Sequence, residues 1–172
     1  MATAPNDITI RPITLRDAEG AAGIYNHYIE NTVVTFEENP VSPQDFSRRI
    51  GDVLSASLPW LVAEQNGNIL GYAYATPWKQ RSAYRFSAET TIYLHHTSGG
   101  QGIGSRLYDA LLPMLRQRGI HAVMGGIALP NSASVALHEK FGFRKVAHFE
   151  QTGFKFGRWV DVGYWQCILG EV

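Results

Sequence analysis

The sequence predicts a single α/β domain in which a mixed, mostly antiparallel sheet is flanked by helices. Three observations lead to this fold class. The chain has 172 residues, of which 45% are hydrophobic, and this length suits one core rather than two. An Asn-Gly pair between two apolar runs is typical of an antiparallel hairpin. Strand-like and helix-like patterns alternate along the chain, and no repeat or linker divides it. The whole chain, 1–172, is therefore expected to form one domain.

Each expected element follows from the spacing of its apolar residues. Alternating or continuous apolar runs predict strands at 8–13, 60–64, 69–75, 84–94, 122–127, 144–149 and 163–169. Helical spacing predicts helices at 15–30, 42–56, 104–118 and 131–141. The aromatic and glycine-rich segment 152–161 is expected to separate the last two strands.

Turn and cap residues support several of these boundaries. Ser42 followed by Pro43 and Asp45 is typical of a helix start, because a hydroxyl caps the first turn and a carboxylate faces the positive end of the helix dipole. Gly142 is expected to end the helix before it, since glycine readily adopts the left-handed conformation of a helix C-terminus. Asn66-Gly67 predicts the hairpin turn.

Composition excludes several classes of function. The chain has 15 basic and 15 acidic residues, so it has no net charge with which to hold a nucleic acid. No apolar run approaches the roughly 20 residues of a membrane span, and the N-terminus does not resemble a secretion signal. A cytoplasmic protein without a membrane partner is expected. Cys167 is the only cysteine, which excludes an internal disulfide and a thiolate-rich zinc site, and no metal is expected.

A glycine-rich loop lies between the strand expected at 84–94 and the helix expected at 104–118. Glycines let several backbone N–H groups point at one anion, and the helix that follows adds its positive dipole end, so a pyrophosphate could bind there. A tight turn without a ligand is the alternative. The loop lacks the lysine of a Walker motif, and it follows a late strand rather than the first strand of a Rossmann fold. Its residues are Gly99, Gly100, Gln101, Gly102, Ile103, Gly104 and Ser105.

This order of strand, glycine loop, helix, strand and a helix starting at Asn131 resembles the GNAT superfamily of N-acetyltransferases. Gly102 and Gly104 occupy the glycine positions of the superfamily's loop motif, whereas Gly99 stands where Gln or Arg is usual. Residues 131–143 are similar to its second cofactor motif. The resemblance extends over nearly the whole chain to the branch that acts on phosphinothricin, methionine sulfoximine and methionine sulfone. The matching segments are 35–37, 59–64, 78–84, 88–89, 129–131, 138–139 and 153–159.

The resemblance implies an enzyme that uses acetyl-CoA to acetylate the α-amino group of a small amino-acid analogue of that type. It also implies a detoxifying role, with resistance to an antibiotic or herbicide, and a homodimer. Two alternatives stay open. One is an acetyltransferase for protein N-termini or polyamines, and the other is a catalytically silent domain that binds acyl-CoA. A small acceptor that bears an anion is favoured over a polyamine because Lys79 and Arg81 would repel a polycation.

The resemblance also assigns roles to individual residues. Glu89 would be the catalytic glutamate that takes a proton from the acceptor amine, and His138 would supply one to the leaving thiolate. An exposed strand residue and a histidine merely hydrogen-bonded on a helix are the respective alternatives. The cofactor-binding residues would be Ile92, Tyr93, Leu94, Gly99, Gly100, Gln101, Gly102, Ile103, Gly104, Ser105, Asn131 and Ser134. The acceptor-binding residues would be Glu89, Phe36, Trp78, Lys79, Arg81 and Tyr84, with Arg81 as the better anion ligand because a guanidinium can engage two oxygens.

Overall fold

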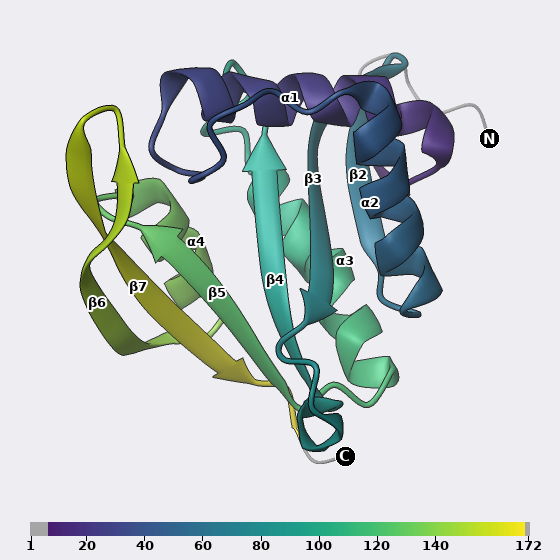
Figure 1. The fold of residues 1–172 in the computed structure, drawn as a ribbon. Helices are drawn as coiled ribbons and strands as arrows, with labels where there is room; N and C mark the ends of the chain where they lie inside the picture. Colours follow the sequence, from purple (N-terminus) through teal and green to yellow (C-terminus); the bar gives the residue numbers. More distant parts are fainter. Residues whose placement is uncertain (1–6, 171–172) are drawn as a thin grey trace.

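The computed structural model describes residues 7–170, which fold into one sheet covered by helices on both faces (Figure 1). The strands are β1 Thr9–Pro12, β2 Trp60–Gln65, β3 Asn68–Pro77, β4 Ser87–Leu94, β5 Ala122–Ala128, β6 Arg144–Lys155 and β7 Arg158–Ile168. The α-helices are α1 Ala18–Asn31, α2 Pro43–Ser55, α3 Ile103–Gln117 and α4 Ser132–Lys140. Two 3-10 turns, η1 Leu15–Asp17 and η2 Ser82–Tyr84, complete the elements.

The sheet is mixed and mostly antiparallel, as the sequence predicts. Its strand order is β1-β2-β3-β4-β5-β7-β6, and only the β4–β5 pair is parallel. That pair is short, because β4 and β5 are in register only from Ser87, opposite Ala122, to Glu89, opposite Met124. Beyond Glu89 the two strands diverge (Figure 1). The sheet therefore opens in its middle, at the end of the shared register.

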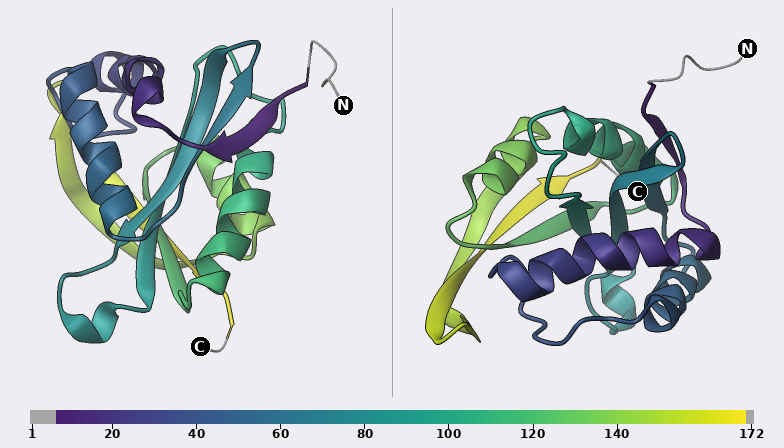
Figure 2. Two further views of the ribbon diagram at one scale, coloured as in Figure 1. Left: turned by 90° about the vertical axis from the view of Figure 1, so that its right-hand side faces the viewer. Right: turned by 90° about the horizontal axis from the view of Figure 1, so that it is seen from above.

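Helices α1 and α2 cover one face of the sheet and α3 and α4 the other (Figure 2). The core is continuous through both layers. Phe46 and Ile50 of α2 are buried against one face, and Leu107 and Leu111 of α3 against the other. Burial of such side chains stabilises the fold by roughly 1.5–3 kcal/mol each. The two halves of the opened sheet are thus held by rigid layers.

The structure corrects two expected elements. Residues 84–86 do not belong to β4, because β3 ends at Pro77, opposite Ala88, and has no residue in register with them. Tyr84 ends the η2 turn, and the Phe86 carbonyl accepts hydrogen bonds from the N–H groups of His121 and Ala122. The segment 152–161 is also not a separate connection. It forms the ends of two long strands, and the chain turns at Phe156 and Gly157, which have φ angles of 52° and 71°.

Candidate active site

A cavity of about 270 Å³ lies where β4 and β5 diverge. It contains both predicted catalytic residues, Glu89 and His138, and one predicted acceptor residue, Phe36. The fold brings them together from three elements: β4, α4 and the loop between α1 and α2. Its remaining lining residues are Val34, Thr35, Thr90, Thr91, Ile92, Tyr93, Gly126, Ile127, Ala128, Asn131, Ser134, Val162 and Tyr164.

Glu89 is the acidic group of this cavity. It is half-buried at the last in-register position of β4. Burial raises the pKa of its carboxyl group, and the positive charge of Lys79 partly opposes that rise. A carboxylate with a raised pKa is a better proton acceptor than an exposed one. Glu89 is thus suited to remove a proton from an ammonium group.

Gly126 of β5 makes room for the Glu89 carboxylate. A Cβ atom at this position would lie 3.2 Å from Glu89 Oε1 and 3.1 Å from the ring of Tyr164. Such contacts are tighter than normal packing allows, so a side chain here would displace one of the two groups. The backbone of β5 at Gly126, which carries no side chain, is therefore part of the site.

His138 is buried on α4, with 3% of its surface exposed. Its Nδ1–H donates to the carbonyl oxygen of Ser134 at 2.7 Å, and its Nε2 lies 3.0 Å from the hydroxyl of Tyr108. Burial lowers the pKa of the imidazole, which favours the neutral ring, and Nε2 is within hydrogen-bond distance of the Tyr108 hydroxyl. Gly125 allows this position, because a Cβ there would meet Nε2 at 2.5 Å.

The hydrogen bonds continue from His138 to the point where the strands separate. The Tyr108 hydroxyl, fully buried on α3, lies 3.2 Å from Thr90 Oγ1. Thr90 in turn donates to the carbonyl oxygen of Met124 at 3.3 Å, across the β4–β5 gap. A second contact of His138 leads to the cavity, since Ser134 Oγ lies 3.4 Å from Nδ1. Both ring nitrogens of His138 thus have polar neighbours.

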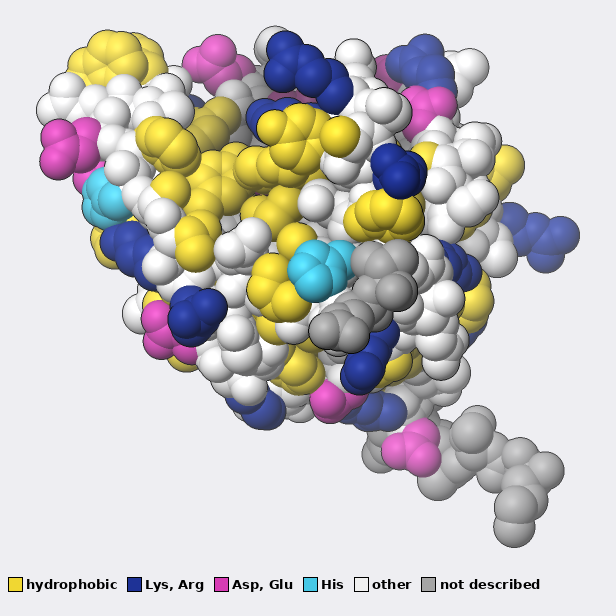
Figure 3. Space-filling view, turned by 90° about the horizontal axis from the view of Figure 1, so that it is seen from below, with side chains coloured by type: hydrophobic (Ala, Val, Ile, Leu, Met, Phe, Trp, Pro, Cys, Tyr) yellow, Lys and Arg dark blue, Asp and Glu magenta, His cyan; other side chains and the backbone are white. Residues whose placement is uncertain are grey.

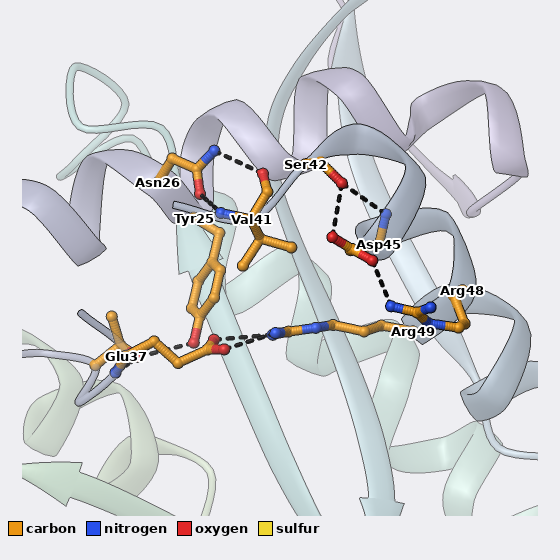
Figure 4. A network of polar contacts seen from close by, with 9 residues as sticks. Tyr25, Asn26, Glu37, Val41, Ser42, Asp45, Arg48 and Arg49 are labelled. Carbon is orange, nitrogen blue, oxygen red and sulfur yellow. Dashed lines mark hydrogen bonds and ion pairs between the residues drawn. The ribbon is translucent and has the colours of Figure 1, made fainter. Parts of the chain in front are cut away.

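The loop between α1 and α2, residues 32–42, places Phe36 in the cavity. Figure 4 shows polar contacts that hold this loop, among them the Glu37–Arg49 ion pair at 2.6 Å. The Tyr25 hydroxyl also lies 2.8 Å from Thr35 Oγ1. On the other side, the Phe36 ring packs on Gly153 of β6, where a Cβ would come within 2.0 Å of it. The long β6–β7 hairpin therefore forms one wall behind Phe36.

A second cavity, of about 280 Å³, extends from the first toward the glycine loop. Six predicted cofactor residues line it: Ile92, Tyr93, Leu94, Gly99, Asn131 and Ser134. Asn131 also caps α4, because its Oδ1 accepts the Ser134 N–H at 3.1 Å. A strand edge without a partner strand and a cavity beside it suit an extended chain such as pantetheine, which can pair with backbone groups.

The glycine loop has the backbone geometry expected for an anion site. Gly100 and Gly102 have φ angles of 75° and 74°, and added Cβ atoms would meet nothing within 4 Å, so the loop surface is open. The first N–H groups of α3, which starts at Ile103, have no acceptor within the helix. The Ile103 side chain is fully buried, which leaves only its backbone for binding. Ser105 Oγ accepts a hydrogen bond from Lys140. The loop therefore fits a pyrophosphate.

The predicted acceptor residues are divided between neighbouring cavities. Trp78, Lys79 and Tyr84 line a cavity of about 440 Å³ that shares Tyr164 with the Glu89 cavity. Arg81 instead lines a fourth cavity, of about 590 Å³, with Lys79. The structure thus does not bring Arg81 together with Glu89. Figure 3 shows this lower end of the molecule, where hydrophobic side chains gather and Lys and Arg side chains border them.

Several residues of the site were not predicted from the sequence. The Gly125-Gly126 pair could have been noticed, since glycine within a strand often marks a close approach of another group. For Thr90 and Tyr164 the sequence predicts only that they lie in strands, and nothing in it marks them as residues of the site. The spacing of Tyr108 predicts an ordinary core residue of α3, and only the three-dimensional structure shows that it contacts His138.

Two further findings concern residues 7–170. No helix among them is both long and apolar enough to cross a membrane. Within the same residues, His, Cys, Asp and Glu side chains form no group of three or more that could hold a metal ion.

An opened sheet with a carboxylate at its gap and a glycine loop at the start of α3 is the arrangement expected of an acyl-CoA-dependent acyltransferase. Comparison with known proteins gives the family. Residues 10–163 match the model of the acetyltransferase (GNAT) domain, so the chain belongs to the GNAT family of acetyltransferases. It is an N-acetyltransferase, and acetyl-CoA is its acetyl donor.

Individual relatives cover nearly the same length. The chain is 42% identical to a phosphinothricin N-acetyltransferase from Streptomyces viridochromogenes, over 92% of this chain and 86% of that protein. It is 34% identical to an L-methionine sulfoximine/L-methionine sulfone acetyltransferase from Salmonella typhimurium, over 95% of this chain and 96% of that protein. Among solved structures, a GNAT superfamily phosphinothricin acetyltransferase from Sinorhizobium meliloti in complex with acetyl-CoA superposes with a TM-score of 0.91. That protein is 34% identical, and the match covers 95% of this chain and 89% of that one.

Proposed function

We propose that this N-acetyltransferase acetylates the α-amino group of a small amino-acid analogue of the phosphinothricin, methionine sulfoximine or methionine sulfone type. Relatives with these activities are similar over most of the chain. The observation that supports the proposal best is the position of Glu89. Its carboxylate lies in a cavity of about 270 Å³, a volume that suits a small molecule.

Proton removal from the acceptor is the role we propose for Glu89. An α-ammonium group, with a pKa of about 8, is mostly protonated at pH 7 and cannot attack a carbonyl carbon. Glu89 would take that proton while the new N–C bond forms. The backbone of Ile92 to Leu94 would hold the pantetheine arm, and the loop 99–105 would hold the pyrophosphate, so that the thioester lies at the gap between β4 and β5.

The leaving sulfur needs a proton as its bond to carbon breaks, and His138 is the residue we propose for this step. Both nitrogens of the His138 ring are already engaged, because Nδ1 contacts Ser134 and Nε2 contacts Tyr108. Ser134 lines the cavity and its hydroxyl lies 3.4 Å from Nδ1. We therefore place Ser134 Oγ between the imidazolium form of His138 and the sulfur: its hydroxyl proton goes to the sulfur, the Nδ1 proton replaces it, and the ring is left neutral.

The acceptor's anionic group is assigned to the cavity next to Glu89. Lys79 and Trp78 line this cavity, and the charge of Lys79 partly opposes the rise that burial causes in the pKa of Glu89. Lys79 thus attracts the carboxylate or phosphinate of an acceptor whose amine is at Glu89. Arg81, in the fourth cavity, would act at longer range. Tyr164 separates the two positions and would determine how long an acceptor can be.

The further parts of the proposal concern the cell and the assembly. We propose a cytoplasmic enzyme that detoxifies such analogues and confers resistance to them. We also propose a homodimer that buries the aromatic end of the β6–β7 hairpin. Phe154, Phe156 and Trp159 are 53%, 59% and 59% exposed there. Large exposed aromatic side chains are typical of protein interfaces. Light scattering of the wild type and of Trp159→Ser tests this: a dimer that becomes a monomer is expected.

Thiol release from acetyl-CoA tests the substrate class directly. The acceptors would be phosphinothricin, methionine sulfoximine, methionine sulfone, ordinary amino acids, a polyamine and a peptide. Turnover confined to the amino-acid analogues is the expected result. Equal turnover of the polyamine or peptide would replace the proposed class. Binding of acetyl-CoA without turnover of any acceptor would instead indicate the silent binding domain.

A further inference from the structure

Three histidines form a cluster that none of the assignments above uses. His27 lies on α1, and His95 and His96 directly follow β4. The rings of His27 and His96 are stacked with centroids 4.2 Å apart, and those of His95 and His96 with centroids 4.4 Å apart. His96 is exposed, and the other two are partly exposed. The cluster is thus accessible to a ligand in solution.

The cluster adjoins the cofactor cavity. His95 and His96 line the cavity of about 280 Å³ that also contains Leu94 and Gly99. They stand where this cavity meets the glycine loop, between the strand that would hold pantetheine and the N-terminus of α3. An anion bound by the loop would therefore lie on the same side as the imidazole rings.

The loop itself supplies no cationic side chain. Residues 97–102 are Thr, Ser, Gly, Gly, Gln and Gly, and Gly99 replaces the usual Gln or Arg. Beyond the loop, Lys140 of α4 reaches Ser105 and Arg106 of α3 bonds to the carbonyl of Ile8. Any cationic side chain on the cavity wall beside Gly99 would therefore have to be one of the histidines.

The groups that face the cluster favour an anion. From α1, Tyr28 faces it but donates its hydroxyl to the Leu94 carbonyl. From the loop, Thr97 Oγ1 lies 2.9 Å from His95 Nδ1. Burial lowers the pKa of His95, and the like charges of His96 and His27 lower it further. No carboxylate is among the groups that shift the pKa of His95. A bound anion would offset the repulsion.

We propose that His27, His95 and His96 in their protonated form bind the pyrophosphate of acetyl-CoA, in place of the side chain that Gly99 lacks. In His95 the Thr97 N–H points at Nδ1 at 3.3 Å, so Nε2 is the nitrogen that faces a ligand. Charge-assisted hydrogen bonds from imidazolium N–H groups to phosphate oxygens stabilise the protonated rings. Binding then takes up protons. The affinity for acetyl-CoA must rise as the pH falls through the histidine pKa range, a dependence that a loop arginine would not produce.

Titration calorimetry without an acceptor tests this inference independently of turnover and of the proposed acceptor. We expect the Kd of acetyl-CoA to be about fivefold to tenfold lower at about pH 6 than at about pH 8. Acetyl-dephospho-CoA, which keeps the pyrophosphate, should show the same change, whereas acetylpantetheine should show none. Heats measured in two buffers of different ionisation enthalpy should report net proton uptake for the first two ligands only.

Variants connect the effect to the cluster. His95→Gln and His96→Gln should each reduce the pH dependence of the Kd, and the triple variant with His27→Gln should abolish it. His148→Gln is the matched control, since His148 is exposed on β6 and bonds to Asp161. Circular dichroism at both pH values verifies folding. A triple variant with unchanged pH dependence, or a change equally large with acetylpantetheine, would overturn the inference. Loss of the effect with acetyl-dephospho-CoA would overturn the assignment to the pyrophosphate.

Discussion

Glu89 of β4 lies directly against Gly126 of β5, at the position where the two strands separate. A Cβ at residue 126 would come 3.2 Å from Glu89 Oε1, so the carboxylate fills the space that a side chain of β5 would otherwise take. The carboxylate's position thus depends on this glycine.

Gly126→Ala should therefore impair activity more than stability. The added methyl group pushes the Glu89 carboxylate or the Tyr164 ring away, and we expect kcat/KM to fall at least about tenfold, since a small misplacement of a reacting group is costly. Steady-state kinetics and thermal unfolding measure the two effects. Gly23→Ala in α1, where a Cβ meets nothing within 4 Å, is the control and should leave kcat/KM unchanged. Equal kinetics for the two variants would refute this role of Gly126.

Lys79 should influence the pH at which kcat/KM falls on the acid side of the pH profile. In the proposed mechanism activity requires ionised Glu89, so kcat/KM should fall as the pH drops through the pKa of Glu89, which burial raises and Lys79 partly lowers. Lys79→Met removes the opposing charge, and the midpoint of the acid limb should move to higher pH. Lys79→Arg should retain the wild-type midpoint. A midpoint that stays in place in Lys79→Met would show that another group governs this limb.

Glu89→Gln should make the protein slightly more stable at pH 7. A carboxyl whose pKa is raised in the folded state binds its proton more tightly there than in the unfolded chain. Its ionisation therefore costs stability above the unfolded pKa, and a neutral amide avoids this cost. We expect the melting temperature at pH 7 to rise by about 2 °C, and the difference from wild type to vanish as the pH falls below about 4. A lower melting temperature at pH 7 would contradict the burial argument.

His138 can be separated into its chemical and structural roles. His138→Gln should lower kcat at least about a hundredfold with little change in acetyl-CoA affinity. Ser134→Ala should lower kcat as well, because its hydroxyl connects Nδ1 to the cavity. Tyr108→Phe, which removes one hydrogen bond to Nε2, should instead cost about 1 kcal/mol of stability and less activity. A His138→Gln variant with a lower melting temperature and wild-type kcat would support the purely structural role.

Lys155 should affect acceptor binding although it is remote from Glu89. Its ammonium group is buried, with 1% of the residue exposed, and donates to the Thr35 carbonyl at 2.8 Å. This bond connects the β6–β7 hairpin to the loop that carries Phe36. Lys155→Met should destabilise the protein by about 2 kcal/mol and raise the KM of the acceptor more than that of acetyl-CoA. Denaturant unfolding and kinetics measure both. Arg158→Met, on the exposed side of the same hairpin, is the control.

Local signals in the sequence were sufficient for most of the fold. Ser42 caps α2 through the Asp45 N–H, and Asn66 and Gly67 form the hairpin turn with positive φ angles, as predicted. The extended strand expected at 84–86 was wrong because strand formation depends on a partner, and β3 ends before it could pair there. The ends of β6 and β7 were missed because Gly153 and Gly157 interrupt the strand pattern, although Gly153 is required by the Phe36 ring.

The candidate site was predictable to the extent that single residues determine it. Glu89 and His138 were chosen from their motifs, and the structure places both on one cavity. The distribution of Trp78, Lys79 and Arg81 among neighbouring cavities depends on how the η2 turn folds back, which no local pattern specifies. The hydrogen bond from Tyr108 to His138 joins residues 30 positions apart and exists only once α3 and α4 pack together.

Acetylation of phosphinothricin and methionine sulfoximine by Glu89→Gln, with Glu150→Gln as the exposed control, tests the central claim most directly. If Glu89 is the base, kcat/KM for Glu89→Gln falls at least about a hundredfold, the Kd of acetyl-CoA is unchanged, and Glu150→Gln resembles wild type. Wild-type kcat/KM in the folded Glu89→Gln variant would contradict the account, because proton removal would then not depend on this carboxylate.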